Sequence, residues 1–344
     1  MKKKIFWAFI TVILAILTLK MLFSKSGLSV DVILQTITNA SPVWLVAALA
    51  CMIAYILFEG EALVLILRTL GYPVKHHKGF LYSAADLYFS SITPSASGGQ
   101  PASAYFMHKD GIPGFAVTAS LIMNVTMYTV AIVTLGVFSI AFFPGVFTKF
   151  NLPCKLMILF GIFMMSLLTL FFIMLLKNQK ILRKTGSLIV ALLKKIRLNK
   201  AASKFNNRID SAIENYNDSV SQLSGKKRFL FKFYLLNLFQ RAAQILVTVF
   251  AFYALGGKLS DGLFIFVVQT YVVLGSNFIP IPGAIGISEY IMFFGYMMIM
   301  DSSSAYHLEF ISRGISFYLC SIVSLFTVIL GYIFLKTKKV EVQK

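Results

Sequence analysis

The sequence predicts an all-α polytopic integral membrane protein, and three observations support that prediction. Hydrophobic residues make up 58% of the 344 residues and charged residues only 13%, which leaves too little polar surface for a soluble protein of this length. Several apolar runs reach about 20 residues, the length of helix that crosses a bilayer. These runs are continuous rather than alternating, which favours helices over the strands of a β-barrel.

Six apolar runs are long enough to be full transmembrane helices. Two shorter runs each lead into a break rich in Pro and Gly and then into another short apolar segment, so we expect each to form a re-entrant broken-helix hairpin. The lysines before the first run resemble the start of a signal peptide, but no small-residue cleavage site follows, so we expect that span to be retained. The predicted full spans are residues 5–23, 43–67, 115–143, 154–176, 229–255 and 308–335, and the hairpins lie around residues 80–107 and 262–300.

Basic residues predict the orientation of these segments. If the N-terminal lysines are cytoplasmic, 24 of the 32 Lys and Arg residues fall in cytoplasmic segments, as the positive-inside rule requires. Both termini are then cytoplasmic, in a multi-pass protein of a bacterial cell (plasma) membrane. The first hairpin enters from the cytoplasmic side and the second from the outside.

The chain divides into two membrane halves around a basic segment. Residues 1–176 form the N-terminal half, and residues 229–344 form the C-terminal half. Residues 177–228 between them carry 13 Lys and Arg residues, with apolar residues at helical spacing. We expect an amphipathic cytoplasmic helix there, either lying on the anionic inner leaflet or packing as an arm against the bundle.

The two breaks share a faint sequence register. Pro94-Ser-Ala-Ser-Gly98 in the first half matches Pro282-Gly-Ala-Ile-Gly286 in the second half. Broken helices at corresponding places of two oppositely oriented halves are typical of a transporter site near the membrane midplane. The match therefore favours an inverted repeat, although two Pro/Gly turns can also look alike by chance.

Ionisable residues inside the spans are candidate functional residues, because burying a charge in a membrane is costly. Arg241 and Glu289 are the stronger candidates, since neither reaches water easily. An i,i+4 pair between Glu309 and Arg313 is expected to be structural, and Glu59 and Glu61 could snorkel to the nearby interface.

An arginine in a membrane cavity can hold a phosphate or carboxylate with two hydrogen bonds. Helix N-termini after the Gly-rich breaks would add backbone N–H donors for an anion. The predicted headgroup-binding residues come from these two kinds of donor and from the charged and polar side chains around the breaks: Asp86, Thr93, Ser95, Ser97, Gly98, Gly99, Gln100, Arg241, Gly283, Gly286, Glu289 and Arg313.

Enzyme signatures are absent from the sequence. The four histidines show no metal-binding spacing, and no phosphate loop, dinucleotide fingerprint or serine elbow is found. The three cysteines lie in or beside separate apolar segments and predict neither a disulfide nor a zinc site. We therefore expect no metal, no cofactor, no catalytic residue and no nucleic-acid partner.

Two motifs resemble those of a known family. The run T-P-S-A-S-G-G-Q-P at residues 93–101 and the run P-I-P-G-A-I-G-I-S-E at residues 280–289 are similar to the lysylphosphatidylglycerol synthase transmembrane-region family, also described as flippase-like. The resemblance covers nearly the whole chain, with Ala284 where the family commonly has a second glycine. It implies a membrane region that flips an aminoacylated phospholipid made by a cytosolic aminoacyltransferase domain. The sequence ends nine residues after its last predicted span, so we expect this chain to lack that domain.

Three functions are consistent with these observations. The first is a flippase-like protein that binds and translocates an anionic, aminoacylated or otherwise charged-headgroup phospholipid. The second is a phosphatidylglycerol lysyltransferase, or its membrane component. The third is a scaffold subunit for a separate transferase partner. The lipid, the energy source and the oligomeric state are not readable from the sequence.

Overall fold

The computed structural model describes residues 36–177, 184, 187, 191, 216, 218–223, 225–279 and 281–341. Side chains are described as far as Phe334. The predicted first span at residues 5–23 and most of the basic segment at residues 177–228 lie outside the described residues.

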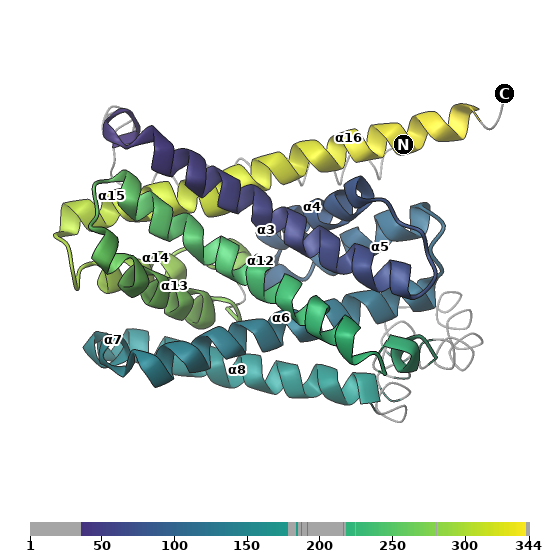
Figure 1. Ribbon diagram of the computed structural model, residues 1–344, viewed down its shortest axis with the longest axis horizontal. Coiled ribbons are helices and arrows are strands. Elements are labelled where there is room, and N and C mark those ends of the chain that lie inside the picture. The colour runs from purple at the N-terminus through teal and green to yellow at the C-terminus, as the bar shows by residue number, and fades with distance from the viewer. Residues whose placement is uncertain are drawn as a thin grey trace.

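Long apolar helices run side by side along the molecule (Figure 1). Six helical segments of the described part are long and apolar enough to cross a membrane. The prediction of an all-α polytopic membrane protein is confirmed. The helices of this bundle are α3 (Pro42–Thr69), α6 (Gly114–Phe142), α8 (Leu152–Lys177), α12 (Lys227–Ala254), α15 (Ser302–Arg313) and α16 (Cys320–Glu341), with the short α7 (Pro144–Lys149) joining α6 to α8.

Two helical hairpins complete the bundle and enter it from opposite ends (Figure 1). The first consists of α4 (His76–Ile92), the short turn η1 (Pro94–Ala96) and α5 (Gly99–Lys109). The second consists of α13 (Gly262–Ser276), the turn η3 (Pro282–Ala284) and α14 (Ile287–Tyr296), after a short turn η2 (Leu259–Asp261). The tips of the two hairpins, η1 and η3, contact each other inside the bundle.

The second hairpin supplies one of the six membrane-length segments, Leu259–Ser276. The sequence predicts that this segment is one arm of a hairpin rather than a full span. Its α-helical part, α13, has 15 residues and therefore rises by only about 22 Å, less than the ~30 Å of a hydrocarbon core. The chain then breaks and turns back, so the observed path is that of a re-entrant arm.

The two breaks have the same backbone conformation over four residues. Thr93 and Ile281 are both extended, with φ of −117° and −116°. The proline that begins η1 corresponds to the one that begins η3, and the next two residues of each turn have positive φ: 51° and 53° at Ser95 and Ala96, and 61° and 50° at Gly283 and Ala284. This local match supports the inverted-repeat hypothesis. The conformations differ from the fifth residue on, where Ser97 is helical and Ile285 is extended.

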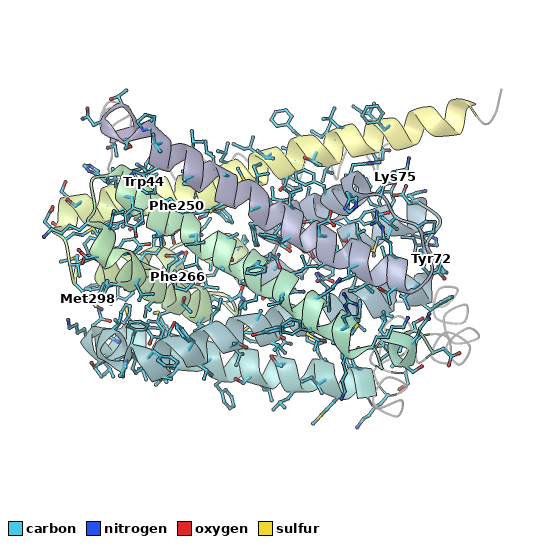
Figure 2. All side chains as sticks on the ribbon, in the orientation of Figure 1. Trp44, Tyr72, Lys75, Phe250, Phe266 and Met298 are labelled. Carbon is cyan, nitrogen blue, oxygen red and sulfur yellow. The ribbon has the colours of Figure 1, made fainter. Side chains whose placement is uncertain are left out.

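Apolar side chains on the outside of the bundle match a lipid environment. Leu152–Leu176 is the most apolar of the six segments, and only 17% of its most apolar 18-residue stretch is buried. Most of its side chains therefore face outward. Figure 2 shows Trp44 and Phe250 together at one end of the bundle and Tyr72 with Lys75 at the other. The Trp44 ring lies 5.7 Å from that of Phe250 and 5.0 Å from that of Tyr253. Aromatic and basic residues at both ends are typical of membrane interfaces.

A helix connection with an unusual turn leads to the last segment. Between α15 and α16 lies a π-helical turn, η4 (Gly314–Leu319). Such turns are rare and often occur at functional sites.

Asp301 caps the start of α15 by accepting hydrogen bonds from Ser303 and Ser304, and the contact with Ser304 lowers the pKa of its carboxyl.

Gly99 allows the two helices of the first hairpin to approach closely. A Cβ at this position would overlap the side-chain oxygens of Asp86 and Ser90 and would lie 2.6 Å from the Asp86 carbonyl oxygen. We expect Gly99→Ala to lower the free energy of unfolding by about 1–3 kcal/mol, because the hairpin must separate to admit the methyl group. Thermal unfolding of the purified protein in detergent measures the change.

Gly114→Ala is the matched control. Gly114 lies in the first turn of α6, and no atom lies within 4 Å of its ideal Cβ position. This substitution should leave stability unchanged or raise it slightly. Equal effects of the two substitutions would contradict the close approach of α4 and α5.

Candidate lipid-headgroup site

A cavity of about 550 Å³ lies at the middle of the bundle, where the tips of the two hairpins meet. Its size falls in the range of ligand pockets, roughly 300–1,000 Å³. The long helices α3, α6, α8, α12 and α16 line it together with both breaks. The non-helical backbone of the breaks thus lines a cavity, which is where irregular backbone is tolerated at membrane depth.

Arg241 is the cation at the centre of this cavity. It lies 14 residues after the start of α12 and 13 before its end, and only 7% of it is exposed. Its Nη1 donates to Gln244 Oε1 at 2.6 Å. Its guanidinium lies 3.8 Å from the centre of the Tyr128 ring and 5.3 Å from that of Tyr55. The two rings therefore stabilise the charge by cation–π interactions.

Arg241 has no ion-pair partner among the described residues. Its Nε is buried and has no hydrogen-bond acceptor within the same part of the chain. A guanidinium is charged at any physiological pH, and a buried charge that lacks a contact partner is costly. An anion bound in the cavity would supply that contact and an acceptor for Nε.

Comparison with known proteins assigns the family. The profile of the family described as lysylphosphatidylglycerol synthase TM region matches residues 6–324. The chain belongs to this family. The match confirms the resemblance inferred from the two break motifs, and it concerns the transmembrane part of the synthase after which the family is named.

One curated relative supports the same assignment. It is a UPF0104 membrane protein of Archaeoglobus fulgidus, 23% identical over 269 residues, which covers 76% of this chain and 78% of the relative. No solved structure matches the chain. The family is associated with lipid handling in membranes.

Two carboxyl groups face Arg241 across the cavity of this family member. Glu59 on α3 accepts hydrogen bonds from Ser83 at 3.1 Å and from Gln240 at 3.0 Å. Asp86 on α4 accepts from Ser90 at 3.0 Å and from Gln100 at 2.5 Å. Glu59 is 5% exposed and Asp86 6%, and the two carboxyl groups interact with each other. Glu59 is therefore buried inside the bundle and does not extend its carboxyl group to the membrane interface.

Arg313 is paired within the second hairpin rather than along its own helix. Its Nε donates to Glu289 Oε1 at 2.9 Å, and its Nη2 donates to the Gly283 carbonyl oxygen at 2.9 Å. The expected i,i+4 pair with Glu309 is therefore wrong. The reason is that the turn η3 and the start of α14 fold back against this side of α15, which brings Glu289 into reach.

One backbone N–H at each break is bonded within its own hairpin. Thr93 Oγ1 accepts from the Gly98 N–H at 2.9 Å. Glu289 Oε2 accepts from the Gly286 N–H at 2.6 Å and from the Ser288 hydroxyl at 3.0 Å. These two donors are therefore occupied, and the prediction that the helix starts bind an anion rests on the N–H groups that follow them.

The predicted site residues divide into two groups. Those that line the cavity are Asp86, Ser95, Ser97, Gln100, Arg241, Gly283 and Arg313. The others act on the hairpins themselves: Thr93 and Glu289 cap helix starts through Gly98 and Gly286, and Gly99 packs against Asp86.

Several lining residues were not among the predicted site. They are Tyr55, Glu59, Asn124, Tyr128, Gln240, Gln244 and Asn277. The sequence contained a pattern that could have indicated some of them. Two pairs of polar residues lie four residues apart in apolar helices: Asn124 with Tyr128, and Gln240 with Gln244. Such pairs share one helix face. Within the described residues, no group of three or more His, Cys, Asp and Glu side chains could hold a metal ion.

The ion pair between Arg313 and Glu289 should stabilise the second hairpin measurably. Their side chains are only 14% and 22% exposed, so the pair is weakly screened. In a double-mutant cycle with Arg313→Ala and Glu289→Ala, we expect a coupling energy of about 1–3 kcal/mol. Denaturant unfolding in detergent measures it.

The pair His76–Glu61 serves as the comparison in the same experiment. These side chains are 64% and 34% exposed at an end of the bundle, so their coupling should be about 1 kcal/mol or less. A coupling at Arg313–Glu289 no larger than this one would contradict the proposed role of the buried pair.

Proposed function

We propose that this protein binds the phosphate of a phospholipid headgroup at Arg241 and moves the lipid between leaflets. The observation that carries the proposal is the buried Nε of Arg241, which has no acceptor among the described residues and lies at the midpoint of the bundle. A guanidinium can give two parallel hydrogen bonds to a phosphate, and its open Nε is one of the donors that such a bond needs. Phospholipids are the phosphate-bearing molecules that surround a membrane protein on both sides of the bilayer.

The arrangement of the hairpins supports transport of a bound lipid rather than binding alone. Hairpins that enter from opposite ends and meet at one cavity are the arrangement from which alternating access is built. Each hairpin could move against the long helices and open the cavity to its own end. The carboxyl groups of Glu59 and Asp86 give the opposite wall a negative character, which suits a headgroup that carries a cationic group as well as phosphate.

This proposal favours lipid transport over the alternative of a lysyltransferase. The charged and polar side chains around the cavity suit the binding of an ion, and no nucleophile with an activating base stands out among the described residues that line it. The orientation, with both termini in the cytoplasm of a bacterial cell, stays a prediction.

The test uses the purified protein in vesicles that contain fluorescent phosphatidylglycerol. Chemical quenching of the outer leaflet measures the lipid that crosses from the inner one. Arg241→Ala should weaken lipid binding about 10- to 100-fold, since a hydrogen bond to a charged group contributes about 1.5–3 kcal/mol. The rate of lipid crossing at limiting lipid should fall with it.

Arg228→Ala is the matched control. Arg228 lies in the first turn of the same helix and is exposed. Its loss should leave binding and crossing unchanged. Crossing by Arg241→Ala at the rate of the parent protein would reject Arg241 as the phosphate ligand, and equal crossing in protein-free vesicles would reject transport altogether.

A further inference from the structure

The carboxyl pair Glu59–Asp86 has a feature that binding of a headgroup does not by itself explain. Two carboxyl groups interact in the middle of the bundle, and each receives one N–H from a glutamine. The remaining side-chain oxygens of those glutamines, Gln240 Oε1 and Gln100 Oε1, are buried and have no donor among the described residues. Gln240 is only 1% exposed. Each glutamine that donates to the pair thus carries a buried oxygen that still lacks a hydrogen-bond donor.

A proton on the pair would supply a missing donor. Glu59 and Asp86 are both buried and line the same cavity, and two neighbouring carboxylates in a low-dielectric site do not readily both stay ionised. A protonated carboxyl gains an O–H that can donate to its neighbour or to a glutamine oxygen. Burial together with the open glutamine oxygens thus favours at least one retained proton.

The other charged and titratable groups around the pair fix the charge of the site. Arg241 on α12 brings one positive charge. Tyr55 on α3, Tyr128 on α6 and Cys320 on α16 also face the centre, and these side-chain types are neutral at pH 7 in their ordinary state. Arg313 also lines the cavity, but its charge is matched by that of Glu289, with which it pairs. With one proton on the carboxyl pair, the remaining carboxylate matches the charge of Arg241, so the site is neutral before a lipid binds.

Binding of a phosphate changes this balance. A phosphodiester adds one negative charge beside Arg241, which would leave a net negative charge in the membrane core. We propose that the Glu59–Asp86 pair then takes up a second proton, so that a phospholipid phosphate and a proton occupy the site together. The step is the capture of H⁺ from water by the remaining carboxylate, which becomes a carboxylic acid. This inference rests on the proposed function, because it assumes the phosphate at Arg241.

The direction of the pH dependence follows from linkage. If the bound state holds one proton more than the lipid-free state, lowering the pH favours the bound state. Affinity should therefore rise as pH falls, by up to about tenfold per pH unit where the second proton is taken up. A proton gradient across the membrane could then drive the lipid in the direction of proton flow.

Calorimetry of the full chain in detergent tests the coupling. The probe is short-chain dihexanoyl phosphatidylglycerol, whose phosphodiester stays a monoanion between about pH 5 and pH 8, so any proton taken up belongs to the protein. Titrations in two buffers of different ionisation enthalpy count the protons. We expect uptake of up to one proton per lipid and tighter binding at lower pH. Glycerophosphoglycerol, the same headgroup without acyl chains, shows whether the phosphate binds without its lipid.

Glu59→Gln and Asp86→Asn test the assignment to this pair. The amide introduced by either substitution would imitate a protonated acid, so each single variant keeps one carboxyl group that can still take up the proton when lipid binds. The double variant Glu59→Gln/Asp86→Asn has no carboxyl group left at the pair and should bind lipid with no proton uptake and little pH dependence. Glu61→Gln is the matched control, since Glu61 lies on the same helix but pairs with His76 outside the cavity. It should keep the proton uptake of the parent protein.

The outcomes separate the two proposals. Lipid binding without proton uptake by the parent protein overturns the coupling and leaves the phosphate site intact. Proton uptake that persists in the double variant Glu59→Gln/Asp86→Asn also overturns it, because the proton then binds elsewhere. Absence of any lipid binding by the parent rejects the phosphate site and the coupling with it. If the double variant fails to fold, the proton count of the parent protein still decides.

Discussion

A bilayer core offers no water to the backbone, and this constraint shapes the whole bundle. Every N–H and C=O at that depth needs a partner within the protein, which straight helices provide automatically and broken helices do not. Here the two breaks meet each other and line a cavity between the long helices. Thr93 and Glu289 each supply an acceptor to the start of the second helix in their hairpin. The polar residues of the cavity come from the breaks and from the helices that face them.

The same constraint explains how much of the fold could be predicted from the sequence. The apolar run at 43–67 corresponds to α3 at Pro42–Thr69, and the run at 115–143 corresponds to α6 at Gly114–Phe142. Lipid requires such runs, so their ends are visible in composition alone. The hairpins were also predictable, because Pro and Gly interrupt runs that are too short to span.

The pairing of charges could not be predicted in this way. Sequence spacing joined Arg313 to Glu309, whereas the fold joins it to Glu289, 24 residues away. Helical periodicity describes only neighbours on one helix, and a re-entrant turn brings distant residues together. Arg241 was a candidate from its position alone. That its Nε has no acceptor and no carboxylate in contact among the described residues is a property of all the surrounding helices, and it appears only when they are assembled.

The polar contacts that hold the two hairpins to neighbouring helices differ in burial. The second hairpin is fastened to α15 by the Arg313–Glu289 pair, whose side chains are 14% and 22% exposed. The first hairpin is fastened to α3 by two contacts: the exposed His76–Glu61 pair at the start of α4, and the Ser83 hydroxyl, which donates to Glu59 inside the bundle. A hydrogen bond to an ionised carboxylate is roughly twice as strong as one between neutral groups, so protonation of Glu59 would weaken the inner contact of the first hairpin and leave the Arg313–Glu289 contact unchanged. Lipid binding that protonates the carboxyl pair would therefore favour movement of the first hairpin over movement of the second.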